Sequence, residues 1–327
     1  MTQQATALNV GHARSEYINP SIGKVGEMYF DEGNNRIKFF SSELHDNSET
    51  IEALVQQGIE MMDKQEATRL NARFFAKLGH KSKLVEARIP LNNGHTGIEL
   101  LFIGYNTEDR RSIQKVVIAE DDIVEKVKSR EITPHEQIQL DYSVEKLTPQ
   151  NTTQQDIKDM VALYEEAFTT YTTTLDYKAV EDMIANSVVY GVRDRNNKVV
   201  STVVGEVATI ETTNDRIRVC ELSEMATLRE HRGHGLVTYA TKMLIDDVRN
   251  DLDLIYTEAR ACHYAINRAF FNLDFEYAGR LNKQCILSGD SEISESGPFE
   301  NLNIWYVLPN EINYNTQQQN HTNDKIN

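Results

Sequence analysis

Residues 217–248 constrain the fold of this chain most, because they join a strand-like run, a basic glycine-containing turn and an amphipathic helix. The run at 218–228 alternates apolar and β-branched residues, which is typical of a strand. Beyond the turn, apolar residues recur at helical spacing, at Leu236, Ala240, Met243, Leu244 and Val248. The first N–H groups of a helix have no partner within it, so a turn that precedes a helix can bind an anion. The pattern therefore predicts a phosphate-binding turn between a strand and a helix.

The turn itself consists of Arg232, Gly233, His234, Gly235, Leu236 and Val237. It is not a P-loop, which needs a Gly-Lys-Ser/Thr ending, and it lacks the third glycine of a dinucleotide fingerprint. The remaining pattern, Arg/Gln-x-x-Gly-x-Gly/Ala, resembles the turn with which GCN5-related N-acetyltransferases (the GNAT superfamily) hold the pyrophosphate of acetyl-CoA. The sequence departs from it at Val237, where the family has Gly or Ala. The resemblance implies acetyl-CoA as co-substrate, bound by these six residues and by Met225, Ala226 and Thr227.

Composition and charge narrow the range of partners. The net charge of −16 argues against nucleic acid, whose phosphates need clustered Lys and Arg. It suits a cationic substrate such as an amine, although solubility alone also explains it. The three cysteines form no Cys-x-x-Cys pair and the histidines lack ligand spacing, so we predict neither disulfides nor a metal site. Without an apolar stretch of about 18 residues or a hydrophobic signal region, the protein is expected to be cytoplasmic, with no membrane partner.

The length of 327 residues is enough for two domains. We predict a loosely ordered start at 1–25, a small α+β domain at 26–105, a charged connecting segment at 106–141, the main domain at 142–309 and a disordered polar tail at 310–327. Strands of the small domain are expected at 27–30, 37–40, 84–89 and 98–103. Helices are expected over 51–62 and, in the connecting segment, over 113–127.

The main domain is predicted to follow the element order βααβββαβαββ. Strands are expected at 144–147, 188–192, 199–204, 218–228, 254–259, 277–286 and 302–308, and helices at 157–168, 176–185, 236–248 and 265–273. Thr152 or Thr153 can cap the first helix. This order resembles the GNAT fold from end to end. That fold is α/β (α+β), with a mixed twisted sheet and flanking helices.

Within the superfamily, the chain is most similar to the beta-lysine N-acetyltransferase family. The likeness covers about residues 28–309, densely over 224–306, and rests on 226–236, 259–261, Asn267, Phe270 and 300–306. The sequence departs from that family at Arg280 and in the loop at 290–298. The resemblance implies acetylation of the terminal amine of beta-lysine, which gives a neutralised compatible solute.

A short internal likeness links the two domains. Residues 75–80 resemble residues 270–275, and each stretch precedes two expected strands. The small domain is then a degenerate half of the same fold, or the likeness is due to chance.

Acetyl transfer to an amine requires a base. A lysine-type amine has a pKa near ~10.4, so deprotonating it at pH 7 costs about 4.6 kcal/mol. Glu221 and Glu224 lie in the strand before the turn, on opposite faces if that strand is regular. We predict Glu224 as the base, acting directly or through a water, and Glu258 on the next strand as its alternative. Backbone N–H groups around 225–227 are expected to stabilise the oxyanion.

Four further residues lie near the expected site, and three of them have two interpretations each. Phe270 takes the place of the family's thiolate-protonating tyrosine, so Tyr264, Tyr256 or water would have to supply that proton. Asn267 is expected to contact the cofactor or to cap a helix. Arg260 is expected to bind a substrate carboxylate through two contacts or to form a structural ion pair. Trp305 is expected either at the substrate or in the core.

Three functions fit these residues. The first is acetyl-CoA-dependent acetylation of beta-lysine, and the second is the same reaction on another small amine, such as a polyamine, a lysine-like amine or an amino sugar. The third is a non-catalytic acyl-CoA-binding regulatory protein, which Phe270 and Val237 favour and the three carboxylates disfavour. The small domain is expected either to shape the acceptor site or to pair two protomers in a homodimer.

Overall fold

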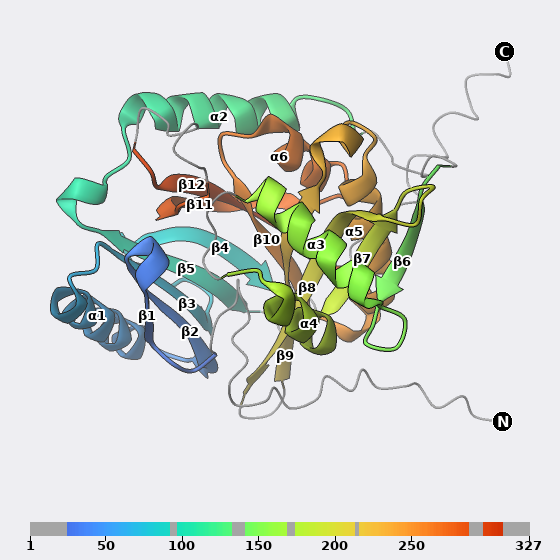
Figure 1. Cartoon of the computed structure of the whole chain (residues 1–327). Helices are drawn as coiled ribbons and strands as arrows, with labels where there is room; N and C mark the ends of the chain where they lie inside the picture. Colours follow the sequence, from blue (N-terminus) through green and yellow to red (C-terminus); the bar gives the residue numbers. More distant parts are fainter. Residues whose placement is uncertain are drawn as a thin grey trace, which may run out of the picture.

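A single sheet runs through both parts of the chain, with helices on its outer faces (Figure 1). The computed structural model describes residues 25–91, 97–132, 141–168, 174–212, 216–287 and 297–309. The sheet has 12 strands in the order β1-β2-β3-β5-β4-β11-β12-β10-β9-β8-β7-β6. The start and tail that we predict to be disordered lie outside the described residues, as does most of the loop at 290–298. No helix in the described ranges is long and apolar enough to cross a membrane.

The N-terminal part contains the predicted helix and four predicted strands, together with one strand that the sequence analysis missed. Its elements are β1 (Tyr29–Asp31), β2 (Arg36–His45), α1 (Ser48–Gln65), β3 (Arg69–Lys77), β4 (Val85–Leu91) and β5 (Ile98–Asn106). β1 and β2 form a hairpin around a short 3-10 helix, Glu32–Asn34. The missed strand is β3, which pairs in parallel with β2 and antiparallel with β5. It therefore lies in the middle of this part of the sheet.

Alternation along β2 and β3 gives this part of the sheet two different faces. One face is apolar and packs against α1; its members are Ile37, Phe39, Leu70, Ala72 and Phe74. The opposite face carries charged and polar side chains that are also buried: Arg36, Lys38, Arg69, Asn71 and Arg73. Buried charges are costly unless other groups compensate them, so this face needs a complementary surface. The C-terminal part of the chain provides that surface.

The C-terminal part follows the predicted order of elements. They are α2 (Gln114–Lys128), β6 (Ser143–Leu147), α3 (Gln154–Ala167), α4 (Tyr177–Asn186), β7 (Val188–Arg193), β8 (Val199–Glu211), β9 (Arg216–Thr227), α5 (Leu236–Val248), β10 (Leu254–Arg260), α6 (Tyr264–Phe271), β11 (Glu276–Cys285) and β12 (Glu300–Val307). Short 3-10 helices lie at Glu108–Arg110, Arg229–His231 and Arg249–Asp251. Of the two predicted caps, Thr153 is the one used, because it forms a capping box with Asp156 at the start of α3.

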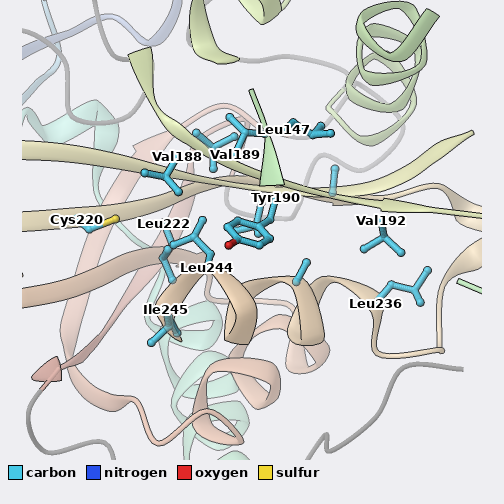
Figure 2. Close-up of a cluster of buried hydrophobic side chains, with 14 of the residues drawn as sticks. Leu147, Val188, Val189, Tyr190, Val192, Cys220, Leu222, Leu236, Leu244 and Ile245 are labelled. Atoms are coloured by element: carbon cyan, nitrogen blue, oxygen red, sulfur yellow. The ribbon is translucent and has the colours of Figure 1, made fainter. Parts of the chain in front are cut away.

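The main hydrophobic core lies between the sheet and α5. Figure 2 shows Leu222 of β9 and Tyr190 of β7 on the side of the sheet that faces Leu244 of α5. On the other side of the sheet, Leu147 and Val189 belong to the same cluster as buried residues of α3 and α4. This packing fixes where α5 begins, and therefore where the glycine turn before it stands.

The predicted connecting helix, α2, packs beside α6 (Figure 1). Arg268 of α6 donates a hydrogen bond to the carbonyl of Val127 at 3.0 Å, and Lys126 lies over the ring of Tyr264 at 5.2 Å. Arg280 of β11 forms an ion pair with Asp121 of α2 at 2.8 Å. The segment is therefore fixed against the C-terminal part of the chain.

The two parts of the chain meet at two places and close a ring of strands. Gly279 of β11 pairs with Ala87 of β4, and Glu43 of β2 pairs with Glu211 of β8. The ring runs β2-β3-β5-β4-β11-β12-β10-β9-β8 and back to β2. Its interior is a second apolar cluster with members from both parts, among them Phe40, Phe75, Phe102, Ile217, Leu254 and Ile304. The charged face of β2 and β3 also points into this ring.

The two parts of the ring repeat one topology. β2, α1, β3, β4 and β5 follow one another in sequence and give the strand order β2-β3-β5-β4. β9, α5, β10, β11 and β12 give the equivalent order β9-β10-β12-β11. The six-residue likeness does not mark this repeat, since Phe75 lies in β3 and Phe270 lies in α6.

Replacement of Gly279 by alanine tests the junction between the two parts. Gly279 has φ +145°, and a Cβ atom there would lie 2.4 Å from the carbonyl oxygen of Glu86 on β4. The strands would have to separate, so we expect Gly279→Ala to lower the free energy of unfolding by at least about 2 kcal/mol. Gly97→Ala is the matched control: φ is also positive there, but no atom lies within 4 Å. We expect it to cost only about 1 kcal/mol. Equal urea midpoints for both variants would contradict the close approach of β4 and β11.

Candidate active site

A cavity of about 690 Å³ follows the ends of β9 and β10. One end is lined by the glycine turn, including Arg232, Gly233 and Gly235. The middle is lined by the last residues of β9, 224–227, and by Phe270 of α6. The other end lies inside the ring of strands, where the lining residues are Arg36, Lys38, Glu221, Glu258, Gln284 and Cys285. The cavity thus joins the predicted phosphate site to the charged interior.

The cavity exists because β9 and β10 stop pairing before either strand ends. Their parallel register runs from Leu254–Val219 to Thr257–Leu222, whereas β9 continues to Thr227 and β10 to Arg260. On its other side β9 pairs with β8, and the register shifts around Glu224, whose φ is +42°. An irregular strand with a positive φ breaks the alternation of side chains. The backbone of 225–227 therefore lies along the cavity, where we predicted the oxyanion donors.

The glycine turn has the backbone that its sequence predicts. Gly233 and Gly235 have φ of +84° and +68°, and Gly235 is the N-cap of α5. No atom lies within 4 Å of a Cβ built on Gly233, so space is open in front of the turn. Arg232 is exposed and its Nε donates a hydrogen bond to the carbonyl of Thr227 at 3.0 Å. These features leave room for an anionic group beside a fixed positive charge.

Tyr142 supports the turn from outside. Its hydroxyl lies 3.0 Å from Nδ1 of His231, and its ring centroid lies 5.9 Å from that of His234. His234 is exposed, while His231 is half-buried. Val237, the residue that departs from the family pattern, lines the cavity together with its neighbour Leu236.

Glu224 is buried and contacts a second carboxylate through a serine. The hydroxyl of Ser223 hydrogen-bonds to Glu224 and also to Oε1 of Glu206 on β8, at 3.1 Å. Glu206 is completely buried and Glu224 is 2% exposed. The sequence analysis placed Glu221 and Glu224 on opposite faces of a regular strand, but β9 is irregular at Glu224 and both residues line the cavity. Glu206 was missed, since only the pairing of β8 with β9 brings it to the site.

Glu221 and Glu258 are held by an arginine from the N-terminal part. Arg73 of β3 contacts Oε2 of Glu221 at 2.6 Å and Oε1 of Glu258 at 2.5 Å. Its guanidinium also donates to the hydroxyl of Tyr256 at 2.8 Å, and that hydroxyl donates to Glu221 at 2.9 Å. The sequence analysis missed Arg73 because it missed β3. The alternation of Arg69, Asn71 and Arg73 with apolar residues could have revealed this strand.

The two carboxylates differ in their pKa values although they share this arginine. Burial raises the pKa of Glu221, and the opposing charge of Arg73 only partly compensates. Burial would also raise the pKa of Glu258, but the charges of Arg73, Arg36 and Lys38 outweigh it and lower that pKa. Glu258 is therefore the more acidic of the two.

Two of the predicted contact residues lie in the core. Asn267 is fully buried; its amide donates to the carbonyls of Arg260 and His263 and accepts from Asn303 and Trp305. These bonds use both of its N–H groups and both lone pairs of its oxygen, so they do not support a cofactor contact. Trp305 is also fully buried, with ring contacts to Phe271 and Tyr277, so of its two expected places the core is the one observed.

Arg260 lines the cavity, but Glu300 holds its guanidinium. Nε and one terminal nitrogen contact the carboxylate of Glu300 at 2.7 and 2.9 Å. The two-point contact that we expected for a substrate is thus made within the protein. Tyr264 lines the cavity near Phe270, whereas Tyr256 is bonded to Glu221 and is not among the lining residues.

Replacement of Arg73 by methionine tests the buried charge network. Removing one partner of a buried ion pair leaves uncompensated charge, so we expect Arg73→Met to lower the free energy of unfolding by about 3 kcal/mol or more at pH 7. Arg111→Met, at an exposed ion pair with Glu108, should change it by less than about 1 kcal/mol.

The loss in Arg73→Met should also depend on pH. The lowered pKa of Glu258 stabilises the wild type above the unfolded value of 4.5, and this contribution fades as pH falls. Without the charge of Arg73, we expect burial to raise the pKa values of Glu221 and Glu258 in the variant, so both would gain protons on folding and its relative stability should improve toward acid. The difference between the urea midpoints of the wild type and of Arg73→Met should therefore become smaller as pH is lowered from 7 to 5. A difference that grows toward acid would contradict this network.

Comparisons with known proteins agree with this geometry. Residues 148–266 match the family model of the acetyltransferase (GNAT) domain. N-acetyltransferase YodP of Bacillus subtilis is 25% identical over 152 residues, 46% of this chain and 50% of YodP. The beta-lysine N(6)-acetyltransferase of Methanococcus maripaludis is 24% identical over 245 residues, 72% of this chain and 82% of that protein. Its counterpart from Methanosarcina mazei is 29% identical over 155 residues, 46% of this chain and 52% of that protein.

The chain therefore spans about half the length of two of these relatives and most of the third. The predicted GNAT fold is confirmed by the family match and by the element order. Together they show that the stretch around residues 148–266 is an acetyltransferase domain of the GNAT superfamily.

Proposed function

We propose that this protein is an acetyl-CoA-dependent N-acetyltransferase that acetylates the terminal amine of a small diamino acid, and that this acceptor is beta-lysine. The observation that carries the proposal is the course of the cavity. It begins at the open glycine turn, passes the irregular end of β9 and ends among buried charges of both signs. A thioester donor and a small charged acceptor can therefore meet at Glu224.

The donor end of the cavity fits acetyl-CoA. The turn at 232–237 and the first N–H groups of α5 would hold the pyrophosphate, with Arg232 beside it. The backbone of 225–227 would bind the pantetheine as an added strand and would donate to the oxyanion. Gly233 leaves open space for close approach, and Val237 lies at the wall of the cavity.

The acceptor end fits a small zwitterion rather than a plain amine. Glu221 and Glu258 can attract ammonium groups, while Arg36 and Lys38 can attract a carboxylate. Beta-lysine has two amines and one carboxylate. Two relatives are named beta-lysine N(6)-acetyltransferases, and one of them aligns over 82% of its own length.

Glu224 supplies the base in this proposal. The terminal amine loses its proton to Glu224, directly or through a water, and its lone pair forms the new C–N bond at the thioester carbon. The C–S bond then breaks, and the CoA thiolate takes a proton from Tyr264, which lines the cavity, or from water. The new amide nitrogen loses its second proton, which restores that donor. The hydroxyl of Ser223 contacts Glu224 and also lies within hydrogen-bond distance of Glu206.

The first test measures CoA release from acetyl-CoA with different acceptors. Beta-lysine, α-lysine, spermidine, glucosamine and no acceptor are compared in parallel at saturating acetyl-CoA. We expect saturable release that prefers beta-lysine by at least about tenfold in kcat/KM, since a charged hydrogen bond left unmade costs about that factor or more. A clear preference for another amine would discard beta-lysine and keep the reaction. Tight CoA binding without CoA release in the presence of any acceptor would favour a non-catalytic acyl-CoA-binding regulatory protein instead.

Two substitutions separate catalysis from donor binding. Glu224→Gln should reduce kcat by about 100-fold or more and leave the Kd for CoA unchanged, because a general base contributes about that factor. Gly235→Val should abolish CoA binding, since a β-branched side chain cannot easily adopt φ +68°. Calorimetry with CoA and steady-state kinetics give the two readouts. Unchanged rates in Glu224→Gln at every pH would remove it as the base, and normal CoA binding by Gly235→Val would refute the pyrophosphate site.

A further inference from the structure

We propose that Glu206 of β8 holds a proton at neutral pH and so keeps Glu224 ionised, with the hydroxyl of Ser223 linking the two carboxyl groups. Glu206 is then a positioning residue, because it acts on the base through Ser223. The role of Glu224 as the base rests on the proposed function. The shared proton rests on the arrangement of the three side chains.

The first argument is a count of hydrogen-bond donors. Oγ of Ser223 contacts Oε2 of Glu224 and lies 3.1 Å from Oε1 of Glu206. A hydroxyl has one proton, which it can donate to one of these oxygens, and lone pairs through which it can accept a second bond. An ionised carboxylate only accepts. Both contacts are therefore hydrogen bonds only if one of the two carboxyl groups is protonated and donates to Ser223.

The second argument is the crowding of buried carboxyl groups at this place. Glu206 is completely buried, and Glu221 and Glu224 are each 2% exposed. Glu206 is the register partner of Glu221 in the antiparallel pair of β8 and β9, so the two side chains point to the same face of the sheet. Like charges at one buried site disfavour each other, and paired carboxyl groups then hold a proton between them.

The surroundings assign the proton to Glu206 rather than to Glu224. Glu224 lines the cavity, which water and the acceptor amine enter, whereas Glu206 is not among the lining residues. Burial disfavours the charged form of a carboxyl group most where solvent is excluded. Ser223 then accepts from Glu206 and donates to Glu224. That charge-assisted bond stabilises the ionised form of Glu224, which is the form that a base needs.

Other titratable groups surround this pair and stay in place in every variant of the test. Those of β2, β3, β9, β10 and the start of α6 are Lys38, Arg73, Glu221, Glu258, His263 and Tyr264. α3 packs on β8 and β9 and adds Tyr164, whose hydroxyl donates to the sulfur of Met183. Burial raises the pKa of the Cys220 thiol, so it stays neutral at working pH. A difference between the wild type and a variant at Glu206 or Ser223 therefore reports on the shared proton.

Infrared spectroscopy measures the protonation state without turnover, because a protonated carboxylic acid has a carbonyl stretching band separate from those of a carboxylate. At pH 7 in D2O, we expect the band of the wild type to lose the intensity of one carboxyl group in Glu206→Gln. Glu181→Gln, at an exposed glutamate of α4 that pairs with Lys178, is the control and should keep the full band. A full wild-type band in Glu206→Gln would overturn the proposal, because Glu206 would then be ionised.

Ser223→Ala gives a second measurement that leaves both glutamates in place. Without the donated bond, the ionised form of Glu224 is less stable, so the acid limb of the kcat/KM profile should move to higher pH by about one unit. Ser112→Ala, which removes a half-buried hydroxyl bonded to Asn301, should leave that limb in place. An acid limb that stays or moves to lower pH in Ser223→Ala would overturn the proposal, since Ser223 would not donate to Glu224. Absence of acetyl transfer in the wild type would overturn the proposed function alone, because the infrared band still locates the proton.

Discussion

The contact of Arg73 with Glu221 and Glu258 is the interaction on which the rest of the structure depends. It joins β3 of the N-terminal part to β9 and β10 of the acetyltransferase domain, inside a ring that both parts close. Neither side could bury its charges alone, because an isolated carboxylate or guanidinium in an apolar interior costs several kcal/mol. The two parts therefore fold against each other as one unit. The N-terminal part forms the inner wall of the acceptor end.

This dependence explains why the proposed acceptor end of the cavity, inside the ring, is lined by charges of both signs, among them Lys38, Glu221 and Glu258. At the donor end, the binding groups are the backbone of the turn and of β9, which need only the correct strand and helix geometry. At the acceptor end, the groups are side chains from β2, β9, β10 and β11 that converge because the ring closes. The glycine turn and the end of β9 lie within residues 148–266, the stretch that matches the family model. Arg36 and Lys38, at the other end of the cavity, lie outside that stretch. Under the proposed function, acceptor choice is thus separated in the chain from acetyl-group handling.

The irregular backbone at Glu224 connects the two ends. A regular β9 would alternate its side chains and keep Glu224 away from Glu221. The positive φ at Glu224 and the register shift against β8 turn its side chain to the cavity and bring Ser223 between it and Glu206. The same irregularity prevents β10 from pairing with the end of β9, which leaves backbone along the cavity. One local distortion thus produces both the position of the proposed base and the groove for the donor.

Local signals in the sequence determined the order of elements in the acetyltransferase domain, the glycine turn with its positive φ values and the cap at Thr153. These depend on periodicity and on residues that favour one backbone conformation, and both are properties of neighbouring residues. The tertiary structure alone decided that Glu221 and Glu224 share a cavity, that Asn267 and Trp305 belong to the core, and that Glu300 holds Arg260. It also decided that Lys38 of β2 lines the cavity and that Arg73 of β3 holds Glu221 and Glu258. The physical reason is that a buried polar side chain takes its role from partners more than a hundred residues away, and no local pattern records which partners the closed ring brings together.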